Sequence, residues 1–184
     1  MSAVATPVPT LTAGTWAVDP SHSSVSFSVR HLMVSKVRGR FGAFTGTIEI
    51  GDDLLASSLQ ASVELTSVNT DDEGRDAHLR GADFFDVEQF PTMSFVSTGL
   101  TAKGDGYALS GDLTIKGVSR PVTFALDFEG VSTDPWGNTK AGFSAETEIN
   151  RKEWGLEWNV ALETGGLLVG EKVKIQLDIE AARA

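Results

Sequence analysis

The stretch VDPSHSSVSFSVRHL, residues 18–32, decides the fold class of this protein. Its apolar side chains Val25, Phe27 and Val29 alternate with serines and an arginine. A period of two residues is typical of a β-strand that buries one face and exposes the other. The stretch therefore predicts a half-buried strand with a histidine near each end.

The same alternation recurs through most of the 184-residue chain and predicts about eight strands. The apolar sets are Val25, Phe27 and Val29; Phe44, Ile48 and Ile50; Leu59, Ala61, Val63 and Leu65; Met93 and Phe95; Tyr107, Leu109, Leu113 and Ile115; Val122, Phe124, Leu126 and Phe128; Ala141, Phe143, Ala145 and Ile149; and Val173, Ile175, Leu177 and Ile179. Short glycine-bearing connections at residues 103–107 and 116–121 are typical of antiparallel hairpins. Phe41 and Phe44 cannot both point inward on an unbroken strand, so we expect a bulge or bend at Gly42.

Two segments break the alternation. Residues 71–91 predict a short helix over residues 73–79, packed at one end of the sheet, and the Trp-rich residues 151–170 predict irregular structure. Residues 1–14, rich in Pro, Thr and Ala, predict a flexible N-terminal arm, which leaves residues 15–184 as one domain. Many antiparallel strands with one apolar face each favour an all-β fold, an eight-stranded antiparallel barrel.

The pattern leaves open whether this barrel is hollow or filled. Small residues at inward positions would leave space; they are Gly46, Ala61, Gly111, Ala141 and Ala145. The inward aromatic rings could fill that space; they are Phe27, Phe95, Phe124 and Phe143. A hollow barrel of eight strands holds one small ligand, whereas a filled one would serve as a scaffold or stress protein.

Composition narrows the class of partner. The formal net charge of −10 disfavours nucleic acid, and the lack of cysteine excludes disulfides and thiolate chemistry. No apolar run approaches the ~18 residues of a membrane helix, and the first residues lack the features of a secretory signal, so we expect a cytoplasmic protein without an integral membrane segment.

The basic row Lys36, Arg38 and Arg40 is interpreted as a solvated outer face; contact with an anionic head group is the alternative.

The histidines do not by themselves indicate a reaction site. His22 and His31 would lie roughly 30 Å apart on an extended strand, so they cannot share a metal ion unless the chain turns back near residues 19–21. The sequence holds no nucleophile-elbow, phosphate-loop or dinucleotide motif. We therefore expect no metal, no cofactor and no catalytic residue, and we interpret these histidines as strand-end tethers that bond to a carbonyl or a carboxylate.

Six blocks of the sequence together carry a family resemblance. They are TWAVDPSHSSVSFSVRHL (15–32), VRGRFGAFTGTIEI (37–50), SVNTDDEGRDAHLRGADFFDVEQFPTMSFVST (67–98), LSGDLTIKGVSRPVTF (109–124), INRKEWGLEWN (149–159) and LVGEKVKIQLDIEA (168–181). In this order they resemble the YceI-like proteins, whose lipocalin-like barrels bind polyisoprenoids. The resemblance spans Thr15 to about Ala181, nearly the whole domain.

The resemblance implies a lipocalin-like barrel with a long apolar tunnel and a bound isoprenoid lipid, such as a prenyl diphosphate or an isoprenoid quinone. It also implies a homodimer, and it does not imply a reaction. The expected tunnel lining is Val25, Phe27, Val29, Phe41, Phe44, Ile48, Ala61, Val63, Phe95, Leu113, Phe124 and Phe143. The head group is expected near His31, His78, Arg80 and Arg151, although stacking of Arg151 on Trp154 or Trp158 is favoured as a structural alternative.

Two rival functions stay open beside the non-enzymatic binding, transport or storage of an isoprenoid. One is an enzyme acting on such a lipid or on another small apolar molecule, which would need a polar cluster facing the cavity, such as His31 near a carboxylate. The other is the filled-barrel stress or scaffold protein. Many YceI-like proteins carry a secretory signal, and the sequence lacks one, which bears against an exported role.

Overall fold

The structure of the protein, a computed structural model, describes residues 10–184. Its strands are β1 (Gly14–Val18), β2 (Ser24–His31), β3 (Ser35–Phe41), β4 (Phe44–Ile50), β5 (Ser58–Glu64), β6 (Val68–Asn69), β7 (Thr92–Lys103), β8 (Gly106–Ile115), β9 (Val118–Thr133), β10 (Thr139–Asn150) and β11 (Val169–Arg183). The α-helix α1 covers Glu73–Arg80, and 3₁₀ turns cover η1 (Pro20–His22), η2 (Leu54–Ala56), η3 (Leu65–Ser67) and η4 (Arg151–Trp154). Within residues 10–184, no helix has the length and apolar character needed to cross a bilayer.

Three of the eight predicted strands are each broken into two pieces. β1 and β2 pair with successive parts of β11, so they form one strand interrupted by η1. β3 and β4 likewise pair with β2 and β1, and β5 and β6 pair with β4 and β3. Counted in this way, the eleven strands of the described range make the eight that the alternation predicts.

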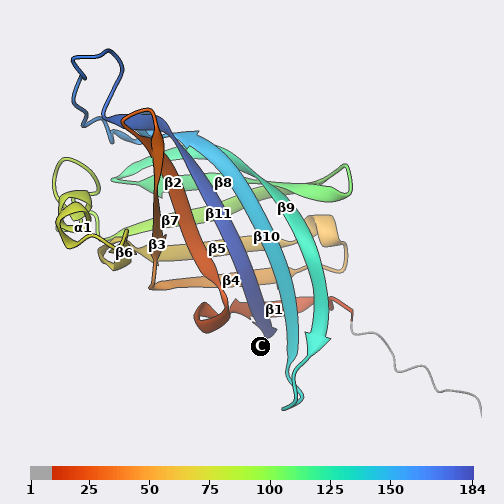
Figure 1. Cartoon of the computed structure of the whole chain (residues 1–184). Helices are drawn as coiled ribbons and strands as arrows, with labels where there is room; N and C mark the ends of the chain where they lie inside the picture. Colours follow the sequence, from red (N-terminus) through yellow and green to blue (C-terminus); the bar gives the residue numbers. More distant parts are fainter. Residues whose placement is uncertain (1–9) are drawn as a thin grey trace, which may run out of the picture.

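The sheet closes into a ring. Antiparallel neighbours follow in the order β1, β4, β5, β7, β8, β9, β10 and β11, and β11 pairs back to β1 through Trp16 and Arg183 (Figure 1). Closure pairs the edges that an open sheet would expose to other chains. The predicted eight-stranded antiparallel barrel is confirmed.

The predicted hairpins and the predicted bend are also present. β7 and β8 pair up to Lys103 and Gly106, and the turn between β8 and β9 places Lys116 and Gly117 at positive φ angles of 52° and 75°. Two consecutive left-handed residues are the signature of the tight hairpin turns that match strand twist. Phe41 and Phe44 are both buried because the chain breaks between β3 and β4, where Gly42 lies.

At one end of the barrel the ring is incomplete. β6 has two residues and pairs with β3 alone among the described strands. Helix α1 follows β6 and lies beside this end of the sheet (Figure 1). Leu79 on α1 and Phe85 after it each pack against both large core clusters. The predicted short helix therefore exists, and it helps to cover the opening between β6 and β7.

Helix α1 is held in place by a buried carboxylate. Asp76 is 8% exposed and accepts hydrogen bonds from the backbone N–H of Thr70, at 2.8 Å, and from the Thr70 hydroxyl, at 2.5 Å. Arg75 donates its Nε–H to the same hydroxyl oxygen at 2.8 Å. These bonds fix the first turns of the helix to the chain that leaves β6.

We expect Asp76→Ala to destabilise the fold by about 1–3 kcal/mol, because it leaves two buried Thr70 donors without their acceptor. Urea unfolding of the purified protein measures the loss. Glu73→Ala, which removes an exposed carboxylate from the same helix, is the matched control and should change stability much less. Equal effects of the two substitutions would contradict an anchoring role for Asp76.

The Trp-rich segment agrees with its prediction up to residue 168, whereas the described end of the predicted arm is held by hydrogen bonds and Gly14 belongs to β1. Residues 155–168 contain no strand, apart from one isolated bridge between Ala161 and Leu167. Of the predicted arm 1–14, residues 1–9 lie outside the described residues. Thr12, within the described part, accepts hydrogen bonds from Trp16 Nε1 at 3.0 Å and from Arg183 at 2.8 Å.

Candidate functional site

The barrel encloses an apolar space, which we name the inner cavity. It has a volume of about 200 Å³ and is lined by inward residues of β1, β2, β4, β5 and β7–β11, together with Leu11 and Leu54. Among the described residues, no charged side chain lines it. Such a lining cannot satisfy a buried charge, so the space suits a hydrocarbon.

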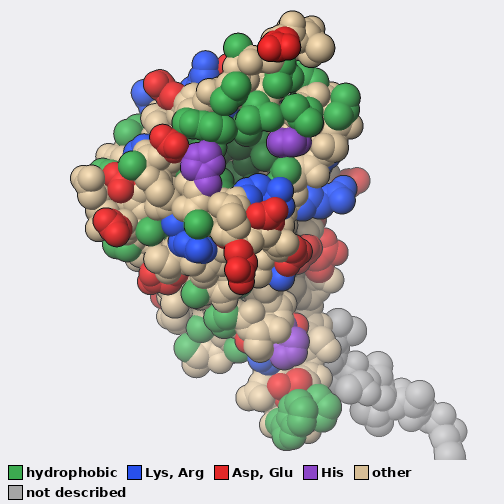
Figure 2. Space-filling model, turned by 60° about the vertical axis from the view of Figure 1, so that its left-hand side comes forward, with side chains coloured by type: hydrophobic (Ala, Val, Ile, Leu, Met, Phe, Trp, Pro, Cys, Tyr) green, Lys and Arg blue, Asp and Glu red, His purple; other side chains and the backbone are tan. Residues whose placement is uncertain are grey.

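A second space, the mouth cavity, lies toward α1 and has a volume of about 250 Å³. Apolar residues line its inner part, whereas Arg30, His31, Arg75, His78 and Arg151 border it as well. No acidic side chain of residues 10–184 lines it. Figure 2 shows a hollow on this side of the molecule, with hydrophobic side chains along its rim, two histidines beside it and basic side chains below.

The two cavities are neighbours inside the barrel. Val25, Met93 and Ile175 border both of them. Neither cavity alone reaches the 300–1,000 Å³ that is usual for ligand pockets, but the two together do. The arrangement is an uncharged inner cavity beside a cavity with a basic mouth, and their union in one tunnel stays a prediction.

Aromatic rings fill only part of the interior. A Cβ placed on Gly111 would lie 2.4 Å from the ring of Phe95, and one on Gly39 would lie 2.3 Å from the ring of Phe27. At these two positions the glycine makes room for a ring, not for a ligand. Ala61 in contrast borders the inner cavity. The barrel is thus partly filled and partly hollow, an outcome between the two that the sequence left open.

All twelve residues expected to line a tunnel border one of the two cavities. Phe44, Ile48, Ala61, Val63, Phe95, Leu113, Phe124 and Phe143 border the inner cavity; Phe27, Val29 and Phe41 border the mouth cavity; and Val25 borders both. The alternation of strands places them there because successive side chains point to opposite faces. Their contact with a ligand stays a prediction.

The four residues expected at the mouth have different surroundings. His31 and His78 border the mouth cavity, and Nε2 of His78 lies 2.9 Å from Asp83 Oδ2, which accepts a hydrogen bond from it. The His78 ring also packs edge-on against Trp158, with centroids 4.6 Å apart. Arg80 borders neither cavity. A histidine–carboxylate pair thus occurs at His78 instead of at His31, but Asp83 does not border the cavity, so the pair is not the cavity-facing cluster that an enzyme would need.

Arg151 is part of the wall. It is 3% exposed, and its guanidinium donates to the carbonyl oxygens of Gly170 at 2.8 Å, Leu156 at 2.5 Å and Val169 at 3.4 Å. Its guanidinium carbon lies 6.0 Å from the centre of the Phe84 ring, so the aromatic partner is Phe84 instead of a tryptophan. Burial lowers the pKa of Arg151, and the negative charge of Glu171 opposes that shift.

Sequence reasoning missed two basic residues at the mouth, Arg30 and Arg75. The signal for Arg75 was available: it precedes His78 by three residues, and such residues share one face of a helix. Arg80 follows His78 by two residues, so about 200° of helical rotation turns it to the other side. No comparable signal existed for Arg30, which alternates outward on β2 while its position at the strand end brings it to the rim.

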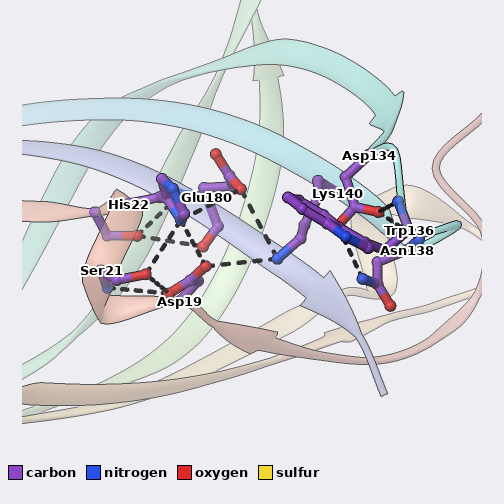
Figure 3. Close-up of polar contacts among 9 residues, drawn as sticks. Asp19, Ser21, His22, Asp134, Trp136, Asn138, Lys140 and Glu180 are labelled. Carbon is purple, nitrogen blue, oxygen red and sulfur yellow. Dashed lines mark hydrogen bonds and ion pairs between the residues drawn. The ribbon is translucent and has the colours of Figure 1, made fainter.

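A separate polar cluster lies where β1 meets β2 (Figure 3), at the opposite end of β2 from His31. His22 Nδ1 lies 2.8 Å from Asp19 Oδ2 and 3.9 Å from Glu180 Oε1. Lys140 Nζ lies 3.5 Å and 3.9 Å from the same two carboxylate oxygens. Asp19, His22 and Glu180 could in principle hold a cation, but Lys140 and His22 already neutralise the carboxylates. This is the tether expected for His22.

The tether makes stability depend on pH. The hydrogen bond to Asp19 and the negative charges of Glu180 and Asp19 raise the pKa of His22 above 6.5. A raised folded-state pKa means that protonated His22 stabilises the fold, fully below the unfolded-state value and less as pH rises through the folded-state value. The hydrogen bonds from Ser21 and His22 lower the pKa of Asp19, whose contribution is present at neutral pH and is lost in acid.

We therefore expect the urea midpoint of the wild type to fall between about pH 6 and about pH 9 by more than that of His22→Gln. The glutamine variant keeps a polar side chain but does not titrate, so the difference between the two proteins isolates His22. Parallel pH profiles of the two proteins would contradict the assignment.

Comparison with known proteins agrees with this geometry. Residues 16–181 match the family model of the YceI-like domain. A UPF0312 protein of Staphylococcus aureus (strain USA300) is 40% identical over 165 residues, which cover 88% of this chain and 94% of that protein. The chain belongs to the YceI-like family. The recognition made from the six sequence blocks is confirmed.

Solved structures show the same fold. The YceI protein of Campylobacter jejuni has a TM-score of 0.70 at 27% identity, covering 84% of this chain and 90% of that one. BcnA of Burkholderia cenocepacia has a TM-score of 0.73 at 24% identity, covering 89% and 98%. A polyisoprenoid binding domain from Saccharophagus degradans has a TM-score of 0.70 at 15% identity, covering 92% and 98%. At such low identities the last two support the fold alone.

Proposed function

We propose that this YceI-like protein binds one isoprenoid lipid in its tunnel and carries or stores it unchanged. The observation that carries the proposal is that an uncharged inner cavity lies next to a basic mouth cavity, with Val25, Met93 and Ile175 bordering both. An amphiphile matches these two environments, because its long hydrocarbon tail suits the uncharged cavity and its one polar end suits the basic mouth. The polyisoprenoid binding named for the Saccharophagus degradans domain, which has the same fold, points in the same direction.

The tail needs no specific polar partner. Burial of hydrocarbon contributes roughly 25 cal/mol per Å² of apolar area removed from water, and ordering of the chain offsets part of that gain. Phe, Leu, Ile and Val side chains of the inner cavity supply such contact along its length. We therefore infer that the tail is bound with little selectivity between similar chains.

The mouth favours an anionic head group over a neutral quinone ring. Five basic side chains and no acidic side chain of the described range border the mouth cavity. Arg75, His78 and Arg151 already bond to protein groups, so Arg30 and His31 are the candidates for direct contact. A phosphate or diphosphate accepts several hydrogen bonds and is attracted by the whole basic set.

The test uses native mass spectrometry and tryptophan fluorescence with farnesyl diphosphate and a longer prenyl diphosphate. We expect one ligand per subunit, recovered with unchanged mass, and a fluorescence change that disappears in Trp158→Phe, because Trp158 borders the mouth cavity. Trp136→Phe is the control, since Trp136 is 84% exposed on the distant β9–β10 turn. The same spectra count subunits and so test the predicted homodimer.

Two results would overturn the proposal. If neither prenyl diphosphate adds mass to the protein or changes the Trp158 signal, the tunnel does not bind such lipids. If the recovered ligand is hydrolysed or otherwise altered by the wild type but not by His31→Ala, the protein is an enzyme, which was the rival function.

A further inference from the structure

The turn between β2 and β3 exposes three consecutive apolar residues beside the mouth cavity. Leu32, Met33 and Val34 are 42%, 55% and 81% exposed. The backbone N–H of Leu32 donates to the carbonyl of Leu168 at 2.9 Å, so the turn is fastened to the loop that precedes β11. Val160 in that loop is also exposed, at 46%. Large apolar side chains gathered at one exposed tip indicate an interaction site.

The backbone of this turn is unfavourable for its residues. Leu32 and Met33 have φ angles of 53° and 64°, and the N–H of Val34 closes the turn onto the carbonyl of His31 at 3.2 Å. Two successive left-handed residues in a hairpin turn favour Asn followed by Gly, not two bulky apolar residues. Strain of this kind persists mainly at functional positions. The fold therefore keeps an apolar tip at a position where polar residues would suit the turn better.

Exposed positive charge lies directly behind the tip. Arg30 and Lys36 are paired across β2 and β3, and Arg38 follows on the same outer face. Like charges directly opposite each other are destabilising in a sheet. None of these three residues forms an ion pair within residues 10–184. The nearby Glu148 and Glu171 are paired with Lys172 at 3.8 Å and Lys152 at 3.0 Å.

We propose that this tip and its basic flank, which we name the docking hairpin (residues 30–38), insert into the surface of an anionic lipid bilayer. Apolar side chains would enter the boundary between head groups and acyl chains, while Arg30, Lys36 and Arg38 would contact the anionic head groups. In a protein of net charge −10, local positive charge is needed to orient this end toward such a surface. Docking would place the mouth cavity against the membrane, where a lipid could pass in or out.

The geometry favours a bilayer over a second protein. A stable protein interface buries roughly 800 Å² on each partner over a broad, complementary surface. The docking hairpin presents a narrow apolar tip with a charged flank. Interfacial membrane anchors have the same arrangement of apolar and basic residues. Two residues of the basic row, Lys36 and Arg38, are thereby given a role, whereas Arg40 lies outside the docking hairpin and is 3.3 Å from Asp71.

Flotation of the full-length protein with vesicles tests this proposal. We expect binding to vesicles that contain phosphatidylglycerol, weak binding to pure phosphatidylcholine vesicles, and release by added salt. Leu32→Asn/Met33→Gly should lower the partition coefficient about tenfold or more while it keeps the turn, because these are the residues that the turn favours. Arg30→Gln/Lys36→Gln should lower it and reduce its dependence on salt.

Trp136→Ser is the control, because it removes the most exposed aromatic residue of the described chain from a different turn and should leave vesicle binding unchanged. The proposal is overturned if the wild type does not float, floats equally with both vesicle types, or is unaffected by the Leu32/Met33 substitutions. If light scattering shows that those substitutions convert a dimer to a monomer without any vesicle binding by the wild type, the tip is a subunit interface. Prenyl diphosphate binding without vesicles is measured separately, so failure of tunnel binding and failure of docking are distinguishable.

Discussion

Ile175→Phe is expected to weaken binding of a long prenyl diphosphate by at least about tenfold and to leave a short one nearly unaffected. Ile175 borders both cavities, at the junction that a long chain must cross. A phenyl ring there would block part of the junction, and each methylene kept out of the tunnel loses roughly 0.8 kcal/mol of burial. A short chain fits on one side of the junction and keeps its contacts.

Competition binding with prenyl diphosphates of increasing length measures this effect. Val96→Phe is the matched control, because Val96 lies on the outer face of β7 and is 47% exposed. It adds the same ring to the surface and should not change affinity at any length. An equal loss for short and long chains would show that the substitution distorts the barrel instead of dividing the tunnel. An undiminished affinity for long chains would mean that the ligand does not pass this point.

Gly111→Ala should produce a large loss of stability, about 2–3 kcal/mol in the free energy of unfolding. The new Cβ would lie 2.4 Å from the Phe95 ring and 2.5 Å from the carbonyl oxygen of Val96. A ring can rotate away, but the carbonyl belongs to the neighbouring strand β7, so the backbone itself must shift. For a chain of this length the loss corresponds to a fall in Tm of roughly 4–12 °C.

Gly99→Ala serves as the control, because a Cβ at Gly99 meets nothing within 4 Å and its φ is not in the left-handed region. It should leave stability unchanged or raise it slightly by restricting the unfolded chain. Phe95→Leu in the Gly111→Ala background should recover part of the loss, since it removes the ring but not the carbonyl. A Gly111→Ala protein as stable as the wild type would show that the strand spacing here is looser than described.

Small inward residues have two different roles in this barrel. Gly111 is small because a ring of the same barrel lies over it, and Ala61 is small where the inner cavity lies. Both read alike in the sequence as small residues on an apolar face. Only the distances across the barrel distinguish a filled position from a lined one.

The period of two residues determined most of the architecture by itself. It placed the twelve expected lining residues on the inward face, because alternation fixes the face of every residue on a strand once one is known. The mismatch between Phe41 and Phe44 indicated the break near Gly42 for the same reason. Helix α1 was predictable because its segment lacks alternation and begins with acidic residues that favour a helix N-terminus.

The tertiary structure alone decided what lies at each end of the tunnel. The partners of His22 include Glu180, which is 158 residues away in the chain, and Arg75 reaches the mouth because α1 covers the gap beside β6. Strand pairing over such separations depends on how the barrel closes, and local sequence patterns do not encode that closure. Alternation told which side chains face inward; the distance between opposite walls decided where they leave an opening for a ligand.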